Sequence, residues 1–175
     1  CTSTDQVTIT VDPLPTADAG VDQTICDGDN AVLGGSPTGP AGATYQWDNT
    51  ASLSSGTVAN PTATPSTTTT YTVTVTDGTT SCTETDQVTI TVNPTPATDA
   101  GSDVAICIGD NTTIGGSPTG PAGATYQWDN TASLSSGTVA NPTATPTVTT
   151  TYTVTVTDGT TSCTSTDQVT VTVNP

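Results

Sequence analysis

The chain has 175 residues and a formal net charge of −16, because it carries 16 acidic side chains and no lysine, arginine or histidine. Without basic side chains it has nothing to bind nucleic-acid phosphates or an anionic membrane surface, and without histidine or lysine it lacks common general bases. No apolar stretch approaches the length of about 18 residues that spans a bilayer. We therefore expect a non-catalytic protein with no nucleic-acid partner, no membrane insertion and no cofactor.

The sequence repeats itself along its length. Residues 34–65 return unchanged as residues 115–146, which is a period of 81 residues. Self-similarity at a fixed period is characteristic of repeat architectures. Each period closes on a near-copy of one segment, CTSTDQVTITVDP at the start of the chain. This phasing predicts the last strand of a preceding repeat at 1–13, a first repeat at 14–94 and a second repeat at 95–175.

The first half of each repeat predicts short strands. In the first repeat, residues 17–26 and 31–34 are expected to form an opening pair of strands joined across an Asp-Gly-Asp turn. Tyr45 and Trp47 lie two residues apart, so they point to the same face of a third strand. Residues 58–65 are expected to supply one or two more strands.

The second half of each repeat has the strongest strand pattern. Residues 71–76 and 88–92 alternate apolar residues with threonine, which is typical of strands buried on one face. Asp77-Gly78 lies between them and predicts a hairpin connection. About seven short strands per repeat favour a β-sandwich of the immunoglobulin type. The expected core is small: Ile25, Leu33, Tyr45, Trp47, Leu53, Tyr71, Val73, Val75, Val88, Ile90 and Val92.

Several strings of the sequence resemble a known class of repeats. ADAGVDQTIC at 17–26, LGGSP at 33–37, ANPTATP at 59–65 and TTYTVTVTD at 69–77 are similar to PKD-like and immunoglobulin-like repeats. Such repeats occur in giant surface and secreted proteins of Bacteroidota-type bacteria. The resemblance implies an all-β fold of tandem immunoglobulin-like (PKD-like) β-sandwiches arranged end to end, located outside the cell or on its surface.

Two disulfide schemes fit the five cysteines. The preferred scheme pairs Cys26 with Cys163 between repeats. In an immunoglobulin sandwich the first turn and the last hairpin lie at opposite ends, roughly 25 Å apart, whereas a disulfide needs Cα atoms within about 7 Å. The alternative pairs Cys26 with Cys82 and Cys107 with Cys163 inside each repeat, and it stays open because strand order decides between the two. In the preferred scheme Cys1 pairs outside this segment, as do Cys82 and Cys107.

The only other candidate site is a cation site formed by aspartates. Asp18 and Asp22 recur as Asp99 and Asp103, close to the linkers. Calcium takes about six to eight oxygen ligands, and few more are evident here, so a solvated strand edge is the competing interpretation.

These observations favour a structural role. We expect a non-catalytic repeat segment of a long extracellular filament or adhesin shaft, stiffened by disulfides, whose partners are neighbouring copies of the same repeat. One alternative is a surface module that binds carbohydrate or Ca²⁺, with surface glycans or other cells as partners. Another is a filament subunit that polymerises by donor-strand exchange through residues 1–13.

Overall fold

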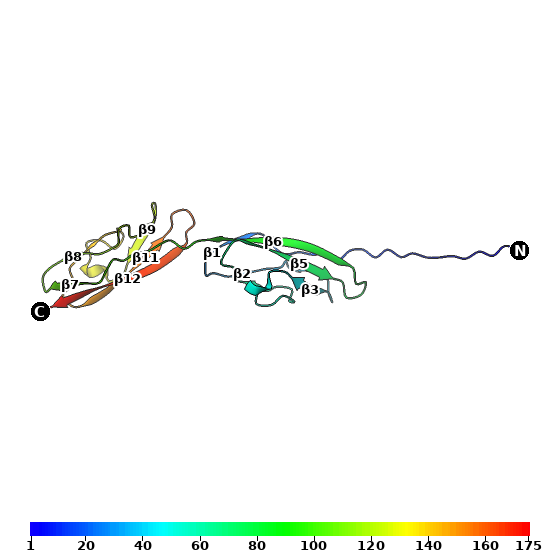
Figure 1. Cartoon of the computed structure of the whole chain (residues 1–175), viewed down its shortest axis with the longest axis horizontal. Helices are drawn as coiled ribbons and strands as arrows, with labels where there is room; N and C mark the ends of the chain where they lie inside the picture. Colours follow the sequence, from blue (N-terminus) through cyan, green and yellow to red (C-terminus); the bar gives the residue numbers. More distant parts are fainter. The chain divides into compact units, whose positions relative to one another are not determined.

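The computed structural model describes all residues from 1 to 175. The chain divides into two compact units, Cys1–Val92 (unit 1) and Asn93–Pro175 (unit 2). Each unit carries its own sheets and its own hydrophobic core (Figure 1).

Unit 1 consists of a four-stranded sheet and a two-stranded sheet. The larger sheet has the order β1-β6-β5-β3, and the smaller pairs β2 with β4. One turn of 3₁₀ helix lies between β3 and β4. The elements are β1 (Gln23–Cys26), β2 (Ala31–Val32), β3 (Thr44–Trp47), η1 (Thr50–Ser52), β4 (Thr62–Ala63), β5 (Thr69–Thr76) and β6 (Thr83–Asn93).

Unit 2 repeats this architecture element by element. Its larger sheet has the order β7-β12-β11-β9, and its smaller sheet pairs β8 with β10. The elements are β7 (Val104–Cys107), β8 (Thr112–Thr113), β9 (Thr125–Trp128), η2 (Thr131–Ser133), β10 (Thr143–Ala144), β11 (Thr150–Thr157) and β12 (Thr164–Asn174). The prediction of an all-β chain of tandem immunoglobulin-like β-sandwiches is confirmed, although each unit has six strands and one helical turn where about seven strands were expected.

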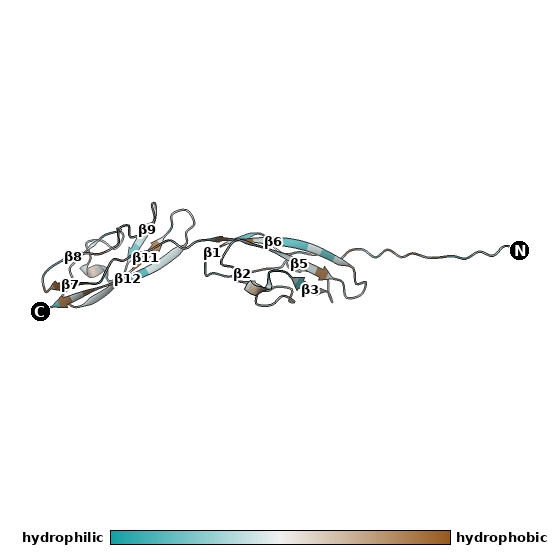
Figure 2. Cartoon of the chain, viewed as in Figure 1, coloured by the Kyte–Doolittle hydropathy of each residue, from teal (hydrophilic) through white to brown (hydrophobic).

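The alternation of threonine and apolar residues builds the sheet. Along β5 the side chains of Tyr71, Val73 and Val75 are fully buried, and the threonines between them are half-buried or exposed. β5 and β6 pair antiparallel from Thr69↔Ile90 to Thr76↔Thr83, so the Asp77-Gly78 hairpin forms as predicted. In Figure 2 the strongly apolar colour is limited to short stretches of strand, including parts of β5 and β7.

The core contains most of the expected large side chains and several small ones that were not expected. Of the eleven predicted core residues, seven are buried, and Ile25, Tyr45, Leu53 and Val92 pack against them while partly exposed. Ala19, Ala31 and Ala63 complete the core and are almost fully buried. Small side chains at these positions let the two sheets approach closely.

The expected opening hairpin is wrong. Residues 17–26 do not form one strand, because Gly20 has a positive φ of 91° and redirects the chain. Before it, the carbonyl of Ala19 accepts a hydrogen bond from the backbone N–H of Gly34 at 2.8 Å. After it, β1 pairs with β6, whereas β2 pairs with β4 in the other sheet. The segment therefore crosses between the two sheets of the sandwich instead of folding back on itself.

Candidate functional site: the cysteine-bearing ends of each unit

One end of each unit is a hairpin that carries a cysteine. In unit 2 this hairpin joins β11 to β12, and the backbone N–H of Asp158 donates to the carbonyl of Cys163 at 2.9 Å. The Asp158 carboxylate accepts from the backbone N–H groups of Thr160 and Thr161, each at 2.8 Å. A Cβ on Gly159 would lie 2.4 Å from the carbonyl oxygen of Gly123, so the hairpin requires glycine there.

These hydrogen bonds set the ionisation of the hairpin aspartates. The pKa of Asp158 lies below its ordinary value because the backbone N–H of Thr161, and then that of Thr160, donate to the charged carboxylate. In unit 1 the pKa of Asp77 is lowered in the same way by Thr80 and Thr79. The hairpin conformation is therefore tied to a charged aspartate in both units.

The other end of each unit carries the second cysteine. Cys26 ends β1, and the next residues turn back so that the backbone N–H of Asp29 donates to the Cys26 carbonyl at 3.0 Å. In unit 2 β7 runs parallel to β12, and Cys107 is paired with Asn174. This end is therefore where the last strand finishes.

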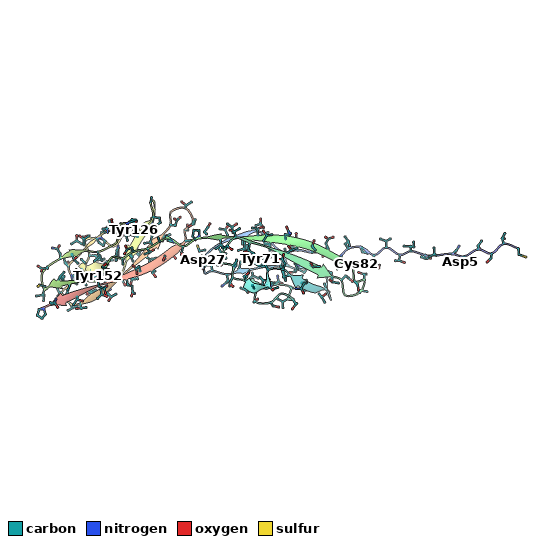
Figure 3. The ribbon with its side chains drawn as sticks, viewed as in Figure 1. Asp5, Asp27, Tyr71, Cys82, Tyr126 and Tyr152 are labelled. Atoms are coloured by element: carbon teal, nitrogen blue, oxygen red, sulfur yellow. The ribbon has the colours of Figure 1, made fainter.

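The two ends of a unit are too far apart for a disulfide. Cys163 lies just before β12, and Cys107 is level with Asn174 near its end, eleven residues further along. At about 3.3 Å per residue this is roughly 36 Å, against a Cα limit of about 7 Å for a disulfide. Figure 3 shows the same separation in unit 1, where Asp27, next to Cys26, and Cys82 lie at opposite ends.

The oxidation states of the cysteines agree with this geometry. Cys82 and Cys107 are free thiols, as is Cys1, so the alternative pairings inside each repeat are not formed. Cys26 and Cys163 are both disulfide-bonded. Cys163 is fully buried, whereas Cys82, its counterpart in unit 1, is partly exposed.

The candidate cation ligands are engaged in hydrogen bonds to the backbone. The Asp18 carboxylate accepts from the backbone N–H of Gly20 at 2.9 Å, and that of Asp22 accepts from Thr89 at 2.8 Å. Asp99 and Asp103 make the corresponding bonds in unit 2. No group of three acidic, cysteine or histidine side chains gathers anywhere in the chain in a way that could hold a metal ion.

Sequence reasoning missed the function of a third pair of aspartates. Asp86, on β6, accepts the backbone N–H of Ala19 at 2.8 Å, and Asp167 does the same for Ala100. The bond between Asp86 and Ala19 and the bond between Asp22 and Thr89 each join residues 67 positions apart. Together they hold the first segment of a unit parallel to its last strand. The signal was the aspartate that recurs in every copy of the DQVT string.

Unit 2 also has an open surface depression of about 710 Å³ beside its edge strand β9. It is lined by Ala124, Thr125, Tyr126, Gln127, Thr138, Val139, Ala140 and Thr157. The lining has no charged residue, and Tyr126 packs partly against the core.

Comparisons with known proteins bear on the fold alone. The chain is similar over 93% of its length to an I-band fragment of titin, with 12% identity and a TM-score of 0.43. It is similar over 97% of its length to the insect immune protein hemolin, with 15% identity and a TM-score of 0.44. Over 93% it is similar to extracellular domains 3–5 of Drosophila OTK, with 16% identity and a TM-score of 0.39.

The chain spans less than two thirds of each of these solved chains: 66%, 49% and 61% of their lengths. No protein-family model and no curated protein matches the sequence. None of the helices is long and apolar enough to cross a membrane. The immunoglobulin-like assignment rests on the order and packing of the strands.

Proposed function

We propose that this chain is a non-catalytic segment of a long extracellular structural array, a filament or an adhesin shaft, in which immunoglobulin-like units follow one another end to end. Residues 1–13 are then the last strand of a preceding repeat, followed by repeats at 14–94 and 95–175. The bacterial, PKD-like surface origin implied by the sequence resemblance belongs to this proposal. Its partners are neighbouring copies of the same repeat, and it needs no cofactor.

The observation that carries the proposal is the placement of the two disulfide-bonded cysteines. In unit 1, residues of the first segment lie beside residues 67 positions later on the last strand. Continued along β1, this spacing puts Cys26 level with Asn93, where the chain leaves the unit. In unit 2, Ala100 is held beside Asp167, so the chain enters this unit near the start of β12, next to Cys163. We infer that one disulfide joins Cys26 to Cys163 across the linker.

A pairing that recurs with the period of the sequence gives every junction a covalent bridge. Cys107 is the counterpart of Cys26 in unit 2, and Cys82 is the counterpart of Cys163 in unit 1. In the array, Cys107 pairs with a following repeat, and Cys82 and Cys1 pair with preceding ones. A linker cut by a protease would then leave the array joined.

The pairing is tested by alkylating the oxidised protein, digesting it at aspartate residues and identifying the linked peptides by mass spectrometry. We expect one linked pair that contains Cys26 and Cys163, with Cys82 and Cys107 alkylated. A linked pair containing Cys26 and Cys82 would disprove the scheme. The Cys163→Ser variant is the control, since it must abolish the linked pair and free Cys26 for alkylation.

The array itself is tested by electron microscopy of the native assembly. We expect thin filaments with an axial step of about 36 Å or slightly more per repeat, because the longest strand of a unit has 11 residues at about 3.3 Å each. Compact particles without an axial repeat would contradict the proposal.

A further inference from the structure

The open depression beside the edge strand β9 has the size of a ligand site. Its volume is about 710 Å³, and ligand clefts commonly measure about 300–1,000 Å³. Val139 lines it and is 44% exposed, so the depression also offers an apolar contact surface. Because the depression is open to solvent, it suits a ligand that lies across the surface of the unit.

Tyr126, on β9 (Figure 3), presents two main-chain groups to this depression. In an antiparallel ladder, alternate residues direct their backbone groups to opposite sides of the strand. The backbone N–H of Trp128 donates to the carbonyl of Gly137 at 2.7 Å, on the side away from β11. The N–H and C=O of Tyr126, two residues earlier, therefore also point away from β11, and no other group of the chain bonds them.

The phenolic hydroxyl of Tyr126 is also unpaired. It makes no hydrogen bond within the chain, and no buried side-chain polar atom lacks a partner, so this hydroxyl reaches solvent. The buried Tyr152 differs, since its hydroxyl bonds Ser133 at 2.7 Å. One tyrosine of each unit thus serves the fold, and the other keeps its hydroxyl available to a ligand.

The ring of Tyr126 is held in place before any ligand binds. It packs partly against the core of unit 2. On Gly120 a Cβ would lie 3.2 Å from the Cε1 atom of this ring, so the absence of a side chain there lets the ring lie close to the backbone. A ring that is already ordered loses little conformational entropy on binding.

The depression is uncharged although the chain carries 16 acidic side chains and no basic one. Its polar side chains are hydroxyls and one amide: Thr125, Gln127, Thr138 and Thr157. Such a lining offers hydrogen bonds without attracting ions, and the net charge of the chain repels anionic ligands. The electrostatics therefore match a neutral ligand rich in hydroxyl groups.

A peptide strand fits this edge poorly. Strand addition depends on a row of free main-chain groups along the edge. Here the N–H of Trp128 is bonded to Gly137, and that of Ala124 to Pro121 at 3.2 Å. Tyr126 alone lies between them, so an added peptide would form too short a ladder.

We propose that this depression binds a neutral polysaccharide. The C–H face of a sugar ring packs against Tyr126 and Val139, and the sugar hydroxyls bond the unpaired groups of Tyr126 and the side chains beside it. This activity goes beyond that of a structural spacer, and it does not depend on the assembly of an array.

The same side chains recur in unit 1. Residues 34–65 and 115–146 are identical, so Tyr45 and Val58 are the counterparts of Tyr126 and Val139. Val58 is 43% exposed, which is close to the value for Val139, and the Tyr45 hydroxyl likewise makes no hydrogen bond within the chain. The chain therefore carries two copies of the site, and variants must change both.

Affinity electrophoresis of the full chain tests the proposal, because the charge of −16 drives the protein through a native gel. Each gel contains laminarin, hydroxyethyl cellulose, galactomannan or soluble starch, and an acidic protein of similar size corrects for the pores of the gel. We expect at least one of these neutral polysaccharides to retard the chain, and polygalacturonate, which is anionic, to leave its mobility unchanged. Normal mobility in all the neutral gels would overturn the proposal, as would equal retardation by polygalacturonate.

A pair of charge variants locates the site. Val58→Asp/Val139→Asp places a carboxylate in each copy of the depression, and we expect it to abolish retardation. The matched control, Val32→Asp/Val148→Asp, adds the same charge at valines that are 56% and 68% exposed and do not line the depression. It must be retarded like the unsubstituted chain, and thermal melts check that both variants fold. Equal retardation of the two variants would overturn the proposal.

A pair of tyrosine variants separates binding from stability. Tyr45→Phe/Tyr126→Phe removes hydroxyls that have no partner in the chain, so the affinity should fall about two- to tenfold while the Tm stays unchanged. Tyr71→Phe/Tyr152→Phe removes hydroxyls that bond serine side chains, so the Tm should fall while the retardation stays unchanged. Undiminished affinity of the Tyr45→Phe/Tyr126→Phe variant would contradict the proposal.

Discussion

Each sandwich buries a tyrosine whose hydroxyl group needs a partner. Tyr71 on β5 and Tyr152 on β11 are both fully buried. Their hydroxyls bond the side chains of Ser52 and Ser133, at 2.6 and 2.7 Å, on the short helical turns of the two units. In many immunoglobulin-like folds the corresponding tyrosine hydroxyl bonds to the backbone, whereas here its partner is a serine side chain on the helical turn.

We predict that Tyr152→Phe lowers the free energy of unfolding of unit 2 by about 0.5–1.5 kcal/mol, because it removes one buried hydrogen bond. Ser133→Ala should have a similar effect, and the double variant should cost less than the sum of the two. Denaturant unfolding of the three variants measures this coupling. Fully additive effects would show that the hydrogen bond contributes nothing.

The hairpin aspartates make stability depend on pH. The pKa of Asp158 is lower in the folded chain than its ordinary value of 3.8, because the backbone N–H groups of Thr161 and Thr160 donate to its charged form. A group with a lowered folded pKa contributes stability above its unfolded pKa and loses it as pH falls through the folded pKa. The stabilising effect of this residue is therefore present at neutral pH and absent in strong acid.

We predict that Asp158→Ala is less stable than the unsubstituted chain at pH 7 and that the difference disappears as pH falls below 3.8. Asp158→Asn keeps an acceptor oxygen without the titrating group, so its stability relative to Asp158→Ala should not change over this range. Thermal melts of the three proteins between neutral and strongly acidic pH check the prediction. A difference that persists in strong acid would contradict it.

At the scale of the elements, the first and last strands of a unit are held together by side chains as well as by the ladder. Asp167 on β12 accepts the backbone N–H of Ala100, and Asp103 accepts that of Thr170. Each of these two carboxylates thus accepts a backbone N–H across the first and last segments of unit 2.

We predict that Asp167→Ala destabilises unit 2 by about 1–3 kcal/mol, because the partly buried N–H of Ala100 loses its acceptor. Asp110→Ala removes an exposed aspartate from a turn and serves as the control, with an expected change within about 0.5 kcal/mol. Chemical denaturation followed by tryptophan fluorescence measures both, in a chain whose Trp47 is replaced by Phe so that Trp128 alone reports on unit 2. Equal effects of the two substitutions would refute the role of Asp167.

The sequence predicted the elements that alternate strictly and failed where single residues redirect the chain. The period-two pattern gave β5, β6 and their hairpin, because burial of one sheet face imposes that pattern. It could not show that Gly20 divides the opening segment between two sheets, since a positive φ leaves no trace in hydrophobic periodicity. It also missed Ala19 and Asp86, because a small core residue and a bonded carboxylate resemble surface residues in sequence.

The separation of the two cysteines of a repeat was predictable from the strand pattern. The repeat period and the expected strand order placed Cys26 and Cys82 at opposite ends of a unit, and the observed register agrees with that separation. The roles of Asp22 and Asp103 were not predictable, because a carboxylate that bonds a strand N–H and one that binds a cation have the same sequence signature.

At the scale of the whole molecule, charge is the dominant long-range interaction. All 16 acidic side chains act without any basic side chain to offset them. Compact states with a large net charge are destabilised by self-repulsion, and dissolved salt screens that repulsion.

We predict that the Tm rises as NaCl is increased from about 0.01 to 0.15 M, over which the Debye length falls from about 30 to 8 Å. Calcium and magnesium chloride at matched ionic strength should raise the Tm by equal amounts. Calorimetric melts in the three salts check this. A larger rise in calcium would support a specific calcium site and would count against simple screening.

The parallel pairing of β7 and β12 determines how unit 2 responds to stretching. Tension on the main chain pulls β7 toward its N-terminal end and β12 toward its C-terminal end, which are opposite directions along one shared ladder. The hydrogen bonds between them are then strained together in shear, and none can be peeled away before the others. A unit stretched through its main chain therefore yields only when this ladder ruptures as a whole.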